Sequence, residues 1–185
     1  MILIIDNYDS FTYNLVQRIG SINPDIKVVL NNQFKIDDIW DWSPSHIIIS
    51  PGPGRPEHAG LSMAVIQQFR EDIPILGVCL GHQCIGTVYG AEVQQAKRIL
   101  HGKTSLIHHS RTHLFQNIPS PFQGARYHSL SINTVPDSFD KSAWTNDGEI
   151  MAITHKEKRV FGVQFHPESF LTPLGSKILE NFLNV

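Results

Sequence analysis

The fold of this chain is constrained most by one cysteine that stands between two glycines at the end of a short apolar run. Residues 75–78 are typical of a buried strand, and they lead into the pattern Gly77-x-Cys79-x-Gly81. Small flanking residues are needed where a strand turns abruptly into a helix. Such a turn exposes the cysteine and directs the helix N-terminus at it, which favours a thiolate. A buried core cysteine does not need these glycines, so we interpret Cys79 as a nucleophile.

The first half of the chain alternates apolar runs with amphipathic segments. Four runs are continuously apolar, as strands buried in a parallel sheet are. They lie at residues 2–5, 26–30, 47–49 and 75–78. Residues 11–19 and 61–69 have the apolar spacing of helices, and Asp9 and Ser10 are suitable caps for the first. This alternation predicts an α/β fold with a doubly wound, largely parallel central sheet flanked by helices.

The second half is richer in β-forming residues, and short polar turns join its segments. The β-rich segments lie at residues 127–135, 149–154 and 160–165. We expect them to extend the same sheet as an antiparallel addition, and residues 174–183 to form a closing helix. The 185 residues suit one core and contain no repeat or obvious linker, so we expect a single domain over residues 1–185.

Composition argues against several kinds of partner. A net charge of −2 and a pI near 6.5 give no basis for binding nucleic acid or an acidic membrane surface. No apolar stretch approaches the ~20 residues of a membrane helix, and the apolar start lacks the features of a signal peptide. The spacing of Cys79 and Cys84 points them to different helix faces, so we expect no disulfide and a cytoplasmic protein.

Two further loops can complete the chemistry of a cysteine nucleophile. Doubly wound sheets place their sites in the loops after strand C-termini, and loops of this kind contain Ser50, Cys79 and His166. His166 can take the thiol proton, and Glu168 can orient the imidazole. Pro167 keeps the backbone before it extended, so that residues two apart leave on the same side.

Acyl transfer also needs donors for an oxyanion, each worth ~3–4 kcal/mol of barrier. The backbone N–H of Leu80, at the start of the predicted helix, is one candidate. The loop at residues 51–54 offers another, because its two prolines stiffen it and leave the amides of Gly52 and Gly54 as its donors.

Three segments together resemble the signatures of class I glutamine amidotransferases. They are residues 77–83, 163–169 and 49–54. Residues 5–12, 101–103 and 126–130 narrow the resemblance to the glutaminase subunits of anthranilate synthase and of aminodeoxychorismate (para-aminobenzoate) synthase. The resemblance extends over essentially the whole chain, and it implies the flavodoxin-like fold of that family.

The resemblance also implies a role for each matching residue. Cys79 would attack the side-chain amide of L-glutamine, His166 would act as acid and base, and Glu168 would orient His166. The resulting thioester would release ammonia first and glutamate after hydrolysis. Gly52 and Leu80 would supply the oxyanion amides. The positions that match glutamine-binding residues of relatives are Gly52, Pro53, Gly54, Gln83, Ser129 and Leu130.

A partner follows from the same resemblance. The ammonia would pass to a separate, larger synthase subunit that uses chorismate and Mg²⁺, in a hetero-oligomer, and no metal or cofactor is expected in this chain. Residues 170–173 favour anthranilate synthase, in tryptophan biosynthesis. Aminodeoxychorismate synthase, in folate biosynthesis, and a glutaminase shared by both remain open.

Two other functions compete with this interpretation. A Gly-x-Cys-x-Gly turn also occurs in thiol hydrolases of related α/β folds, but the loop at residues 51–54 and the His166-Pro167-Glu168 order argue against that class. A non-catalytic subunit that only stabilises its partner is the other alternative. The presence of Cys79 together with His166 and Glu168 argues against it.

Overall fold

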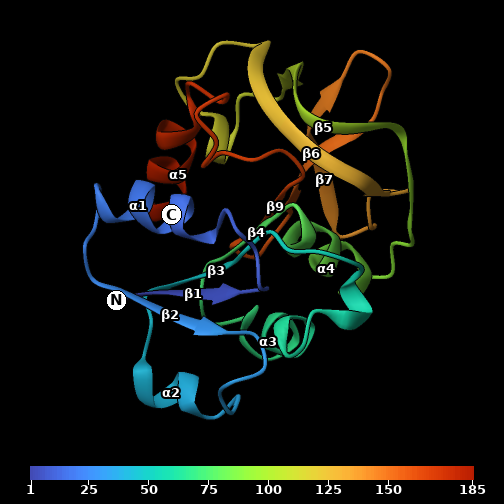
Figure 1. Cartoon of the computed structure of the whole chain (residues 1–185). Coiled ribbons are helices and arrows are strands. Elements are labelled where there is room, and N and C mark those ends of the chain that lie inside the picture. Colours follow the sequence, from blue (N-terminus) through green and yellow to red (C-terminus); the bar gives the residue numbers. More distant parts are fainter.

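Nine strands form one sheet, and helices cover both of its faces (Figure 1). The strands of this computed structural model are β1 (Ile2–Asp6), β2 (Ile26–Leu30), β3 (His46–Ile49), β4 (Ile75–Val78), β5 (Val93–His109), β6 (Phe122–Ile132), β7 (Phe139–Thr145), β8 (Ile150–His155) and β9 (Val160–Val163). The helices are α1 (Thr12–Gly20), α2 (Asp38–Trp42), α3 (Ser62–Phe69), α4 (Leu80–Val88) and α5 (Gly175–Leu183), with short 3₁₀ turns η1 (Pro56–His58) and η2 (His113–Phe115). Side chains are described for residues 1–97 and 102–185, so His101 of the segment 101–103 lies outside the described residues.

The sheet has a parallel half and an antiparallel half. Its strand order is β2-β1-β3-β4-β9-β8-β7-β5-β6. The pairs from β2 to β9 are parallel, and the pairs from β9 to β6 are antiparallel. The predicted α/β sheet with an antiparallel extension is therefore confirmed, and β9 is the strand at which the direction changes.

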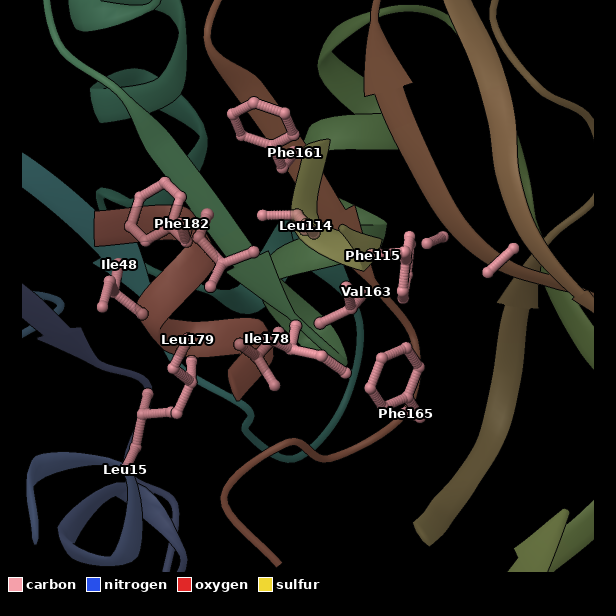
Figure 2. Packing of buried hydrophobic residues seen from close by; sticks show 14 of the residues in the cluster. Leu15, Ile48, Leu114, Phe115, Phe161, Val163, Phe165, Ile178, Leu179 and Phe182 are labelled. Carbon is pink, nitrogen blue, oxygen red and sulfur yellow. The ribbon is translucent and has the colours of Figure 1, made fainter. Parts of the chain in front are cut away.

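The strands of the parallel half are apolar on both faces, and successive residues feed two separate cores. Ile2 and Ile4 of β1 point to the side of α1 and α5, whereas Leu3 and Ile5 pack on the side of α3 and α4. Figure 2 shows the first core. There, Ile178, Leu179 and Phe182 of α5 lie beside Leu15 of α1, Ile48 of β3 and Val163 of β9.

The helix predictions hold to within one residue, but part of the antiparallel half differs from its prediction. The strand expected at residues 127–135 is β6, which begins at Phe122 and ends at Ile132. Strands β5 and β7 and the short helix α2 have no counterpart in the sequence predictions. Exposed polar residues are frequent along β5 and β7, as at Gln94 and Asp140, so neither has the apolar run that marks a buried strand.

The N-cap of α1 is Phe11, so Asp9 is not the cap predicted for this helix, but Asp9 and Asp6 form hydrogen bonds in the turn before it. The Asp9 carboxylate accepts the N–H of Phe11 at 2.9 Å. Asp6 Oδ1 accepts the Thr12 hydroxyl at 2.8 Å and the Asp9 N–H at 3.1 Å. The Ser10 side chain makes no such bond, so the cap predicted for it is wrong.

Among the residues described, none of the helices is both long and apolar enough to span a bilayer.

Candidate active site

Three neighbouring parallel strands bring the predicted loops to one edge of the sheet. β3, β4 and β9 lie side by side, and their carboxyl ends lead into Ser50, Cys79 and Gln164 respectively. This is the edge at which open α/β sheets bind ligands.

The turn at Cys79 has the strained geometry that its glycines predict. Cys79 has φ 51° and ψ −99°, in a region that residues with side chains rarely adopt. A Cβ on Gly77 would lie 2.3 Å from the Gly81 carbonyl oxygen, and one on Gly81 would lie 2.4 Å from that of Ile49. The Cys79 N–H donates to the Val163 carbonyl at 2.8 Å, which ties the turn to β9. Both glycines are therefore required for the close approach of α4 to β3 and β4.

His166 and Glu168 are paired as the sequence predicts. His166 Nδ1 lies 2.6 Å from Glu168 Oε1, and both side chains are buried. Thr172 holds the loop from within, because its hydroxyl donates to the His166 carbonyl at 2.7 Å and accepts the Ala125 N–H at 2.9 Å. Arg18 of α1 donates to the Glu168 carbonyl at 3.0 Å.

The other nitrogen of His166 is left free for chemistry. Nε2 is buried and has no hydrogen-bond partner among the described residues. Phe11 and Tyr127 cover the imidazole, with ring centroids 6.1 Å and 5.1 Å from it. Burial lowers the pKa of His166, but the neighbouring Glu168 and Cys79 outweigh burial and hold that pKa well above its ordinary value. The arrangement therefore favours an imidazolium next to the cysteine sulfur.

A cavity of about 150 Å³ opens beside Cys79. Its lining contains Cys79 and all seven residues predicted to bind glutamine or the oxyanion: Gly52, Pro53, Gly54, Leu80, Gln83, Ser129 and Leu130. Tyr127 and His128 complete the lining. The cavity therefore brings together residues from the loop after β3, the start of α4 and strand β6, and their individual roles stay predictions.

The profile of one protein family matches nearly the whole chain: residues 3–185 match the family described as glutamine amidotransferase class-I. The chain belongs to the class I glutamine amidotransferases. The bifunctional protein TrpGD of Thermotoga maritima is 51% identical over 100% of this chain, which spans 32% of that longer protein. The aminodeoxychorismate/anthranilate synthase component 2 of Bacillus subtilis is 49% identical over 99% of this chain and 95% of the relative.

Solved structures agree with this assignment. A protein from Thermoplasma acidophilum, described as belonging to a GMP synthase, superposes with a TM-score of 0.87 at 26% identity. The superposition covers 99% of this amidotransferase and 92% of that chain. The family resemblance read from the sequence is thus confirmed.

In this amidotransferase, two of the predicted binding groups have atoms already engaged within the protein. Gln83 Nε2 donates to the Leu130 carbonyl at 3.0 Å and to Gln164 Oε1 at 3.2 Å. The Leu130 carbonyl also lies 2.9 Å from His128 Nδ1. Of these groups, the Oε1 atom of Gln83 remains available to an amino-acid head group, whereas the Leu130 carbonyl does not.

The loop of Gly52 is held by a buried polar cluster around Asn7. Asn7 donates its N–H to Ser50 Oγ and its side-chain amide to the Ser50 carbonyl, each at 2.9 Å. Asn7 Oδ1 accepts from Asn31 at 2.9 Å and from Ser62 at 2.8 Å. Sequence reasoning assigned Asn7 no role, although it lies within the segment 5–12 that narrows the family resemblance. Its neighbours come from three separate elements, so no local pattern could reveal the cluster.

The second cysteine, Cys84, is a core residue. Cys84 is fully buried, and both cysteines are free thiols. Burial raises the pKa of the Cys84 thiol to about 12, so this thiol is unreactive near neutrality.

Acid is expected to destabilise the fold through His82. This residue of α4 is fully buried against Gly162, and burial lowers its pKa from 6.5 to about 4. Between these two pH values His82 is protonated in the unfolded chain and neutral in the folded chain. Stability that is present above pH 6.5 is therefore lost as the pH falls, by about 1.4 kcal/mol per pH unit. Urea unfolding at several pH values measures this slope.

The matched comparison is His82→Leu against His58→Gln, which changes an exposed histidine. His82→Leu should flatten the slope by one proton, and His58→Gln should leave it unchanged. An unaltered slope in a folded His82→Leu protein would contradict the assignment.

Proposed function

We propose that this chain is the glutaminase subunit of a chorismate-using synthase, and that it supplies ammonia made from L-glutamine. The observation that carries the proposal is the cavity beside Cys79, because it joins a nucleophile, a buried His166–Glu168 pair and every predicted glutamine-binding residue. The names of the component 2 relatives support a synthase partner. The two free thiols fit the cytoplasm expected from the sequence.

The proposed reaction has two acyl-transfer steps. The Cys79 sulfur attacks the side-chain carbonyl carbon of glutamine, and the N–H groups of Gly52 and Leu80 hold the oxyanion. His166 Nε2 gives its proton to the leaving nitrogen, so that ammonia departs and a γ-glutamyl thioester remains. Water then attacks the thioester while His166 accepts its proton, and glutamate leaves as Cys79 is regenerated. Glu168 keeps the imidazole oriented in both steps.

We assign anthranilate synthase as the partner, with its larger subunit using chorismate and Mg²⁺. The segment 170–173 supports this choice, and Phe170 within it is 81% exposed, where a partner can reach it. Aminodeoxychorismate synthase is the second candidate, because the Bacillus subtilis relative bears both names.

Reconstitution distinguishes the two partners. The chain is mixed with the large subunit of either synthase, chorismate and Mg²⁺, and product is measured with glutamine or with ammonia as nitrogen source. We expect glutamine-driven anthranilate. Glutamine-driven product only with the large subunit of aminodeoxychorismate synthase would reassign the chain to folate synthesis, and product with both would make it shared. Product from ammonia only, when each large subunit is active, would contradict the glutaminase proposal.

A further inference from the structure

Gln164 is a buried amide in direct contact with the nucleophilic sulfur. It follows β9 and is fully buried, and its backbone N–H donates to the Met151 carbonyl at 2.8 Å. Its side-chain Nε2 lies 3.5 Å from Cys79 Sγ. Gln164 thus supplies a side-chain amide to this sulfur, and the imidazole of His166 is the other polar group that interacts with it.

The direction of this bond is fixed by the groups behind it. The Leu130 carbonyl can only accept, so Gln83 must present its Nε2 to it. The same Nε2 also donates to the side chain of Gln164, so the accepting atom of Gln164 must be Oε1. The remaining end of the Gln164 amide is the NH₂ group, and that end faces Cys79. The sulfur therefore meets a donor.

A buried arginine fixes, through His128, the second hydrogen bond to the Leu130 carbonyl. Arg126 Nε donates to His128 Nε2 at 3.0 Å, and a guanidinium is always a donor. His128 therefore carries its proton on Nδ1 and donates it to the Leu130 carbonyl at 2.9 Å. Arg126 is itself paired with the buried Glu149 and bonds to Ser105 Oγ at 3.3 Å.

We propose that Gln164 is a catalytic residue that stabilises the Cys79 thiolate before glutamine binds, and that Gln83, His128 and Arg126 are positioning residues that fix its orientation. The role of Gln164 in glutamine hydrolysis rests on the proposed glutaminase function. Its stabilisation of the Cys79 thiolate can be measured without glutamine and does not rest on that function. A donor already aimed at the sulfur stabilises the charged form and does so without reorganisation.

The charged and titratable groups around the sulfur come from four elements. His166 and Glu168 lie on the loop after β9, His82 on α4, and His128 on β6, while Asp9 before α1 interacts electrostatically with His166. Burial lowers the pKa of His82 to about 4 and that of His128 to about 3. Both side chains are therefore neutral over the pH range in which alkylation of Cys79 is measured. His166 is the one of these histidines that carries charge near the sulfur, and it is unchanged in the variants below.

The test measures the rate of Cys79 alkylation by iodoacetamide against pH, without glutamine. Gln164→Met keeps the length of the side chain but removes the donor, and it should raise the midpoint of the profile by about one pH unit or more. Gln164→Glu should raise it further, because a carboxylate replaces the donor. Gln17→Met, an exposed position on α1, is the matched control and should leave the midpoint unchanged.

An unchanged midpoint in a folded Gln164→Met or Gln164→Glu protein overturns the proposal. If neither variant folds, Gln83→Met decides: an upward shift supports the orientation chain, and no shift overturns it. Glutaminase activity of the unmodified complex is assayed in parallel. Glutaminase activity with unshifted alkylation profiles would refute the role of Gln164 alone, and shifted profiles without glutaminase activity would refute the proposed function alone.

Discussion

Replacing Cys79 with alanine is expected to abolish glutamine hydrolysis, with a loss of more than about a thousandfold. Alanine leaves no atom that can form the thioester, while the backbone of the turn and the cavity stay in place because alanine is no larger than cysteine. Release of glutamate from glutamine, measured with the partner subunit present, gives the size of the loss. Product formation from ammonia by the same complex should persist, since this route does not use the thiol.

The matched control is Cys84→Ala, which removes the other thiol from the core beneath α4. It should keep glutamine-dependent activity within a few-fold of the unmodified protein. Formation of glutamine-dependent product by the Cys79→Ala protein would contradict the covalent mechanism. Loss of the ammonia reaction as well would indicate an inactive large subunit rather than a loss of chemistry at Cys79.

Gly52→Ala is expected to lower kcat for glutamine by about 10²–10³. A Cβ at this position would lie 2.5 Å from Asn7 Cβ, 2.7 Å from the Asn7 carbonyl oxygen and 2.9 Å from Leu80 Cδ2. Asn7 cannot move aside, because Ser50, Asn31 and Ser62 hold it. The loop itself must shift, and the Gly52 amide then leaves the position where it could meet the oxyanion. Steady-state kinetics with glutamine measure the effect.

Gly20→Ala provides the comparison for this substitution. Its Cβ would meet only Ile26 Cδ1, at an ordinary contact distance of 3.7 Å. Activity should therefore be retained. A Gly52→Ala protein with normal kcat would show that the Gly52 N–H does not donate to the oxyanion. The other steps of the mechanism would be unaffected by that result.

The parallel half of the fold and the triad could be predicted because their signals are local. An apolar run that ends in Gly77-x-Cys79-x-Gly81 specifies a strand, a turn and a helix within a few residues. His166 and Glu168 are close in sequence, and Pro167 between them sets the backbone that lets them meet. Adjacent parallel strands then bring the loops together, as the sheet order shows.

The remaining features depend on contacts between distant segments. Strands β5 and β7 are held by pairing with neighbours, so their sequences need no continuous apolar face. Gln164 stands in a segment that the family resemblance already included, yet its contact with Cys79 depends on the pairing of β4 with β9. The Arg126–Glu149 pair likewise joins two distant segments, and neither residue is unusual in its local sequence.

The central place of β9 has a consequence for biosynthesis. β9 is made after the other eight strands of this sheet, yet it lies between β4 and β8. On the ribosome, the segment with Cys79 therefore emerges long before the strand that completes its surroundings and before His166 and Glu168. Until then the nascent chain carries the Cys79 thiol without the His166–Glu168 pair that is proposed to activate it. Cys79 can therefore work with His166 and Glu168 only after β9 has entered the sheet between β4 and β8.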